Sequence, residues 1–168
     1  SASSIYGGSW TEGAGAVFAE NQVLEFLASE AGLPKGAGGV FVQGGTLGNL
    51  SALVVARDVA EAKHGRQNWA IICSSEAHSS VKSVGKVMGV TVLSADASKT
   101  GSLTGAAAES AIQEAKKQGL TPFALVGTSG TTNFGIIDKL DELADVAAAN
   151  DLWFHVDGAY GLAGVLVQ

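Results

Sequence analysis

Apolar residues recur at helical spacing in five segments of the chain. In the first segment, Val23, Leu24 and Leu27 belong to a stripe that one face of a helix would present. Glycine or asparagine follows four of the five segments, and both residue types commonly end helices. Thr104 and Asp138 begin two of the segments and are suited to cap them. We therefore predict helices over residues 20–31, 47–63, 79–88, 104–118 and 138–149.

Short apolar runs without helical spacing lie between these segments, at residues 69–73, 90–93, 123–126 and 152–157. Continuous apolar runs of this length are typical of strands that are buried on both faces. Strands that alternate with helices predict βαβ units and a parallel sheet. We therefore expect an α/β fold of three layers, with a mostly parallel sheet and helices on both of its faces.

Polar residues gather where the predicted strands end, at residues 74–78, 127–132 and 155–160. A glycine-rich turn, residues 43–49, also opens the second predicted helix. Ligands of parallel α/β sheets bind beyond the carboxyl ends of the strands. The sequence therefore predicts a ligand site that these four segments form together.

The glycine turn has two interpretations. Gly44 and Gly45 would let backbone N–H groups approach an anion at a helix N-terminus, and Thr46 would add a hydroxyl donor. The same residues also suit an ordinary tight turn with a threonine cap, which is the better interpretation of this segment alone. The turn has neither the Lys-Ser/Thr ending of a P-loop nor a GxGxxG pattern, so nucleotide binding is not favoured.

Asp157 ends the last apolar run. Burying a carboxylate is costly unless a cation meets it, so an aspartate at this position indicates a cationic ligand group. His155 lies two residues earlier, and both side chains therefore point to the same face of the strand. His155 is equally well explained as support for Asp157 and as a core histidine with satisfied hydrogen bonds. A metal site would need His78 as a third ligand, and we rank this alternative low because no local spacing supports it.

Two further polar positions allow a structural or a functional interpretation. His78 follows a predicted strand, where an imidazole can stack on a ring, transfer a proton, or simply cap the next helix. Thr132 belongs to a turn, residues 127–135, in which four hydroxyl residues lie between two glycines. Such a turn is either a flexible loop or a holder of ligand oxygen atoms, and the density of hydroxyls favours the second.

Composition narrows the possible partners and compartments. The chain has 168 residues, of which 46% are hydrophobic and 15% are charged, so it can bury a substantial core. Its formal net charge is −6 and it has no basic run, which argues against nucleic acid or an anionic membrane as a partner. The single cysteine, Cys73, suits a reducing cytoplasm, and no apolar stretch is long enough to span a membrane. Ser1 and Gln168 suggest cuts within a larger protein.

Taken together, these segments resemble the group II pyridoxal phosphate-dependent amino acid decarboxylases, the family of the aromatic amino acid and glutamate decarboxylases. The matching motifs are residues 44–50 with 56–57, 75–80, 128–135 with 137–138, and 153–161. Their order and spacing agree with the family across nearly the whole chain. The resemblance implies the type I aminotransferase-like fold of the pyridoxal phosphate-dependent transferases. Residues 1–168 would form part of its large cofactor-binding domain, without the N-terminal segment, the Schiff-base lysine region and the C-terminal small domain.

The resemblance also implies roles for residues around the cofactor. Gly45 and Thr46 would bind the phosphate of pyridoxal 5'-phosphate. His78 would stack on one face of the pyridine ring and take part in catalysis, while Ala159 would pack on the other face.

The remaining implied roles concern the polar edge of the ring. Asp157 would be the second catalytic residue and would pair with the ring nitrogen, while Thr132 would lie near both and His155 would support the site. A carboxylate at that nitrogen keeps it protonated, and a protonated ring absorbs the electrons that carbon dioxide leaves behind. No metal is implied.

The family's Schiff-base lysine lies beyond the Asp157 motif, and no lysine of this chain has that context. We therefore expect the parent protein to decarboxylate an L-amino acid to an amine and CO2, as a cytoplasmic homodimer with its active site at the interface, and the chain alone to be inactive. Another type I-fold reaction, by an aminotransferase, aldolase or cysteine desulfurase, remains an alternative. So does a non-catalytic fragment that keeps the fold.

Overall fold

The computed structural model describes residues 8–167, and these residues belong to two compact units. Among them, residues 8–42 and 164–167 belong to one unit, and the other is Gln43–Ala163. Ser1 and Gln168, where the sequence suggested cuts within a larger protein, lie outside the described residues.

The first unit is built on helix α1 (Trp10–Glu30). Ser9 caps it, because its hydroxyl accepts a hydrogen bond from the backbone N–H of Glu12, and the helix has a kink at Gly13. Glu20 accepts a hydrogen bond from the backbone N–H of Phe41 at 2.7 Å, which ties the following segment to the helix. The predicted helix began only at residue 20, because the two glycines of the first half hide its apolar spacing.

The second unit contains a parallel sheet whose strand order is β2-β1-β3-β4. Its helices and strands alternate along the chain, as predicted. The elements are α2 (Gly45–His64), β1 (Trp69–Ser74), α3 (Ser79–Met88), β2 (Thr91–Ala95), α4 (Gly105–Lys117), β3 (Thr121–Thr128), α5 (Leu140–Ala149) and β4 (Trp153–Asp157). A short 3-10 helix, η1 (Leu162–Leu166), was not predicted.

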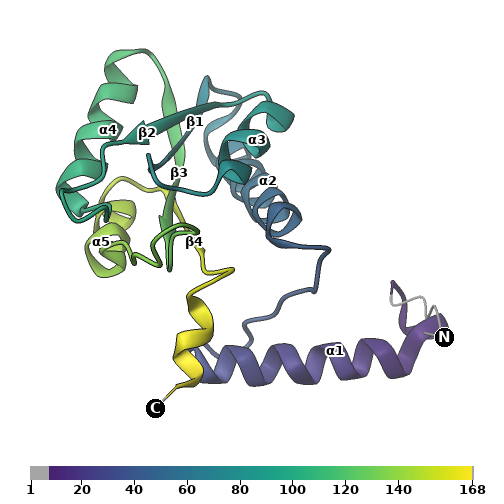
Figure 1. Ribbon diagram of the computed structural model, residues 1–168. Coiled ribbons are helices and arrows are strands. Elements are labelled where there is room, and N and C mark those ends of the chain that lie inside the picture. Colours follow the sequence, from purple (N-terminus) through teal and green to yellow (C-terminus); the bar gives the residue numbers. More distant parts are fainter. Residues whose placement is uncertain (1–7, 168) are drawn as a thin grey trace. The chain divides into compact units, whose positions relative to one another are not determined.

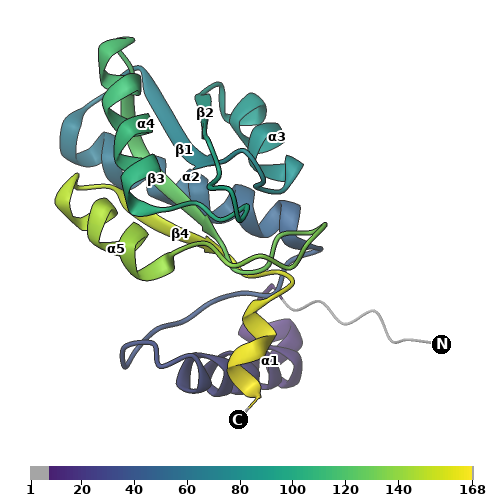
Figure 2. The same ribbon diagram turned by 60° about the vertical axis from the view of Figure 1, so that its left-hand side comes forward.

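Helices cover both faces of this sheet, which confirms the three-layer α/β prediction (Figure 1). Figure 2 shows α4 and α5 together on one face. Neighbouring strand residues point to opposite layers: Ile71 and Cys73 pack with residues of α2 and α3, whereas Ile72 packs with residues of α4 and α5. Burial on both faces explains why the central strands lack polar alternation.

The ends of the helices follow from local chemistry. Gly89 ends α3 in the left-handed conformation, with φ of 67°, and Thr104 caps α4 through a hydrogen bond from the backbone N–H of Ala107. Cys73 is fully buried in β1, and burial raises the pKa of its thiol to about 11, so it is an unreactive core residue as the sequence suggested. Among residues 8–167, no helix is both long and apolar enough to cross a membrane.

Close packing between α3 and β2 leaves no room for a side chain at Gly85. A methyl group there would lie 2.3 Å from Cγ2 of Val92 and 3.3 Å from the carbonyl oxygen of Val90. We expect Gly85→Ala to lower the free energy of unfolding by about 1–3 kcal/mol, because the helix has to move off the strand. Urea denaturation measures this change. Ser83→Ala, at an exposed position of the same helix, is the control, and equal stability of the two variants would contradict the packing.

Candidate active site

A cavity of about 240 Å³ lies within the second unit, at the carboxyl ends of β3 and β4. Six of the seven residues that the sequence assigned to a cofactor site line this cavity: Gly45, Thr46, His78, Thr132, Asp157 and Ala159. His155 does not line it and lies behind it instead, in contact with Asn49. The four polar segments therefore meet at one cavity, as predicted.

The N-terminus of α2 forms one wall of the cavity. Gly44 precedes the helix with φ of 92° and ψ of 162°, a conformation that only glycine adopts readily, and no side chain caps the helix. The first N–H groups of a helix have no partner within it, and the helix dipole adds a positive field. Gly45 and Thr46 provide two of these N–H groups, so this wall is suited to an anion.

Asp157 provides a negative charge elsewhere in the same cavity. It is the last residue of β4 and pairs in register with Thr128 of β3. One carboxylate oxygen accepts a hydrogen bond from the backbone N–H of Ala159 at 3.2 Å, and the other accepts one from Nδ2 of Asn49 at 2.9 Å. Two N–H donors therefore fix the half-buried carboxylate, and lone pairs remain for a ligand cation.

His155 supports this arrangement from behind. Its Nε2 lies 2.8 Å from Oδ1 of Asn49, the residue that also binds Asp157. Burial lowers the pKa of His155 below its ordinary value, although the negative charge of Asp157 acts in the opposite direction. The imidazole is therefore a neutral hydrogen-bonding group near pH 7. His155 is thus a partly buried histidine whose contact with Asp157 runs through Asn49, and its role as support for the site stays a prediction.

His78 combines a structural position with exposure to the cavity. Its Nδ1 accepts a hydrogen bond from the backbone N–H of Ser80 at 3.2 Å and thereby caps α3. The same nitrogen lies 2.8 Å from the hydroxyl oxygen of Ser80. The imidazole is exposed on the cavity side, so capping does not exclude contact with a ligand.

The prediction that Asp138 caps a helix is wrong. Helix α5 begins at Leu140, and its N-cap residue, Lys139, makes no side-chain cap bond. Asp138 is buried and accepts hydrogen bonds from the backbone N–H groups of Leu103 and Thr128, each at 2.7 Å. Burial raises the pKa of Asp138 even though both hydrogen bonds favour its ionised form. Its contacts hold the end of β3 in place beside the cavity.

Thr128 was not singled out from the sequence, although it lines the cavity beside Asp157. Its hydroxyl oxygen is buried and has no hydrogen-bond partner among the described residues. Buried polar atoms are rarely left unpaired, so this hydroxyl keeps hydrogen-bonding capacity that the described residues do not use. Together with the α2 N-terminus and Asp157, it suits a polar ligand with one anionic and one cationic group.

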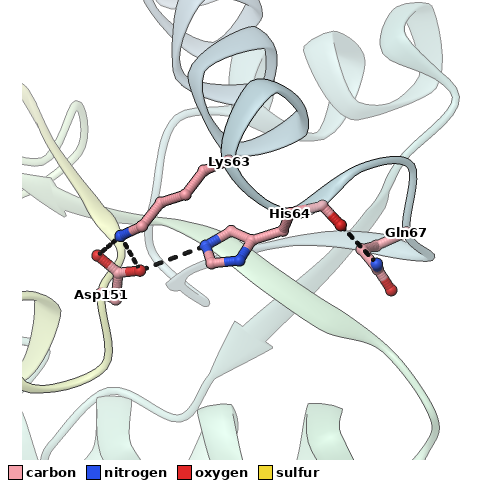
Figure 3. Close-up of polar contacts among 4 residues, drawn as sticks. All are labelled: Lys63, His64, Gln67 and Asp151. Carbon is pink, nitrogen blue, oxygen red and sulfur yellow. Dashed lines mark hydrogen bonds and ion pairs between the residues drawn. The ribbon is translucent and has the colours of Figure 1, made fainter.

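A second polar cluster lies away from this cavity, near the amino ends of β1 and β4 (Figure 3). Lys63 donates hydrogen bonds to Asp151, the shorter measured at 2.5 Å, and Nε2 of His64 lies 3.3 Å from the same carboxylate. Lys63 lowers the pKa of Asp151. All three side chains are exposed, so the cluster has the character of a surface ion pair. No group of three or more His, Cys, Asp or Glu residues among those described is placed to hold a metal ion.

Comparison with known proteins matches residues 7–167 to the family model described as "Pyridoxal-dependent decarboxylase conserved domain". The chain is 34% identical over 167 residues to an aromatic-L-amino-acid decarboxylase of Bacillus atrophaeus, covering 98% of this chain and 35% of that protein. The chain therefore spans about a third of the length of this relative.

Solved structures agree with this match. The glutamate decarboxylase domain of diaminobutyrate-pyruvate transaminase and L-2,4-diaminobutyrate decarboxylase from Vibrio parahaemolyticus superimposes with a TM-score of 0.90 at 36% identity, over 96% of this chain and 39% of that one. Oryza sativa TDC with PLP and tryptamine superimposes with a TM-score of 0.88 at 27% identity, over the same shares of the two chains.

The role of Asp138 leads to a prediction about stability. In Asp138→Asn, the amide NH2 group would face a backbone N–H that now has a carboxylate acceptor. We expect the variant to lose about 2 kcal/mol of unfolding free energy, because one buried donor is left unpaired. Chemical denaturation with Asp145→Asn as control, an exposed position on α5, measures the difference. Equal stability of the two variants would show that Asp138 does not hold the loop.

Proposed function

The chain belongs to the pyridoxal-dependent decarboxylase family, and from this premise we propose that it forms the cofactor-binding core of an enzyme that decarboxylates an L-amino acid. The proposed products are the corresponding amine and CO2. The proposed cofactor is pyridoxal 5'-phosphate, in line with the family's description and with a structural neighbour that carries PLP.

One observation carries the proposal: a single cavity offers an anion-binding helix N-terminus and a fixed carboxylate. The cofactor has the matching groups, a phosphate and a ring nitrogen that can be protonated. In our proposal Gly45 and Thr46 hold the phosphate through the first N–H groups of α2 and the threonine hydroxyl. Asp157 accepts a hydrogen bond from the protonated ring nitrogen.

Other residues that line the cavity would fix the plane of the ring. We assign His78 to one face of the ring and Ala159 to the other, since a flat imidazole and a methyl group leave a slot for a planar ligand. Thr132 would contribute a hydroxyl at the polar edge. Thr128 adds a second one, because its buried oxygen lacks a partner among the described residues.

Bound pyridoxal phosphate supplies an electron sink for the pair of electrons that the departing carboxylate leaves behind. The contribution of Asp157 is electrostatic, because its negative charge keeps a proton on the ring nitrogen. His155 is partly buried behind Asp157 and neutral, so it adds no charge that would oppose this proton.

In this family a lysine binds the cofactor. We assign that lysine to a part of the protein outside this chain. Among the described residues, no lysine lines the cavity. We propose that a downstream lysine of the parent protein completes the site. Residues 1–168 would then correspond to part of the large cofactor-binding domain.

We also propose a cytoplasmic homodimer with the active site at its interface. Tyr160 lines the cavity and is 72% exposed, and Phe134 of the neighbouring turn is 73% exposed. Aromatic side chains exposed beside a site are typical of surfaces that another chain covers. The free thiol of Cys73 suits a reducing compartment.

The test is a panel of L-amino acids, aromatic and diamino acids included, assayed for CO2 release by the full-length protein with pyridoxal phosphate. We expect release from at least one amino acid. Asp157→Asn should lower it about 100-fold or more, because the ring nitrogen loses its counter-charge. Asp151→Asn, an exposed aspartate at the opposite end of β4, is the matched control and should keep the wild-type rate.

Two outcomes would contradict the proposal. Amino-group transfer to a keto acid without CO2 release would indicate an aminotransferase instead. Equal rates in the Asp157→Asn and Asp151→Asn variants, with unchanged circular dichroism, would remove Asp157 from the reaction.

A further inference from the structure

Asn49 lies at the centre of the polar contacts behind the cavity. Its side chain is buried, with 5% exposure, and its amide contacts three residues on two other elements, α3 and β4. Nδ2 donates to Asp157 at 2.9 Å and to the hydroxyl oxygen of Ser80 at 3.0 Å, while Oδ1 lies 2.8 Å from Nε2 of His155. Both amide hydrogens and the carbonyl oxygen are therefore engaged.

These contacts determine the orientation of the amide. An ionised carboxylate only accepts hydrogen bonds, so the NH2 group of Asn49 must face Asp157. The carbonyl oxygen then faces His155 and can only accept. It follows that Nε2 of His155 carries the ring proton.

The contacts of Ser80 determine the tautomer of His78 in the same way. The Ser80 hydroxyl oxygen accepts from Asn49, which leaves its hydrogen free to donate to Nδ1 of His78. The backbone N–H of Ser80 also donates to that nitrogen. Two donors at Nδ1 leave the imidazole proton of His78 on Nε2.

We propose that Asn49 is a positioning residue: its amide fixes the orientation of the Asp157 carboxylate and holds His155 as the neutral Nε2–H tautomer. A ring proton on Nδ1 alone would turn the lone pair of Nε2 toward the amide oxygen and leave that oxygen unpaired. The consequence for cofactor binding rests on the function proposed above, whereas the tautomer of His155 does not depend on it.

The tautomers can be tested by NMR. In 15N-histidine-labelled protein free of cofactor, a 1H–15N correlation spectrum shows which ring nitrogen carries the proton. At about pH 7.5, where a histidine of ordinary pKa is neutral, we expect Nε2–H forms for His155 and His78. Single His→Gln variants assign the signals, and a short unstructured histidine peptide serves as the reference for a ring in tautomer exchange. A proton on Nδ1 of His155 in the wild-type protein would overturn the proposal.

Two substitutions separate the contributions of the amide. Asn49→Leu removes every hydrogen bond, so the signals of His155 should become those of exchanging tautomers while His78 keeps its Nε2–H form through Ser80. Asn49→Asp keeps an acceptor for His155 and removes the donor to Asp157, so the His155 tautomer should persist. If the Leu variant does not fold, the spectra of the wild-type protein and the Asp variant still test whether Asn49 holds the tautomer of His155. Loss of the His155 Nε2–H form in the Asp variant, or its persistence in a folded Leu variant, would overturn the proposal.

Affinity for added pyridoxal phosphate, measured by fluorescence, gives the second readout. We expect roughly tenfold weaker binding by both variants, which corresponds to the loss of one hydrogen bond to a charged group. Wild-type affinity in a folded variant would contradict the positioning of Asp157. Absence of binding by the wild-type full-length protein would instead refute the proposed function and leave the tautomer result standing, so the two failures are distinguishable.

Discussion

The hydrogen bond between Asn49 and Asp157 is the interaction on which the candidate site depends. Asp157 ends a strand and Asn49 lies in the first turns of α2, so this bond joins the carboxylate to the helix whose N-terminus is open to an anion. The parallel register then sets Thr128 beside Asp157, and Asp138 holds Thr128 through its backbone N–H. Two sites of opposite preference, one for a cation and one for an anion, are therefore held within one cavity.

Most of the second unit was predictable, because apolar spacing reports how a segment is buried. Continuous runs indicated strands covered on both faces, and Gly89 and Thr104 marked helix ends through chemistry that is local to each end. The ends of the strands were less predictable than their centres. Strand β2 extends two residues past its predicted range, 90–93, and the almost fully buried β3 extends two residues past each end of 123–126. Serine, threonine, proline and glycine interrupt the apolar runs there.

The motif residues of the site were found from the sequence, but the residues that hold them were not. Asn49 and Asp157 are 108 positions apart, and no local pattern indicates that they meet. Asp138 illustrates the same limit. An aspartate before an apolar helical segment predicts a cap, yet its oxygens accept from the backbone of two other segments. Such partners become visible only when the sheet brings the strand ends together.

The central claim is that Asp157 faces a protonated ring nitrogen. The most direct measurement is the 15N chemical shift of ring-labelled pyridoxal phosphate bound to the full-length protein, recorded with wild-type Asp157 and with Asp157→Asn. The account predicts a protonated nitrogen near neutral pH in the wild-type protein and an unprotonated one in the variant. An unprotonated nitrogen in the wild-type protein, or the same shift in both, would contradict it.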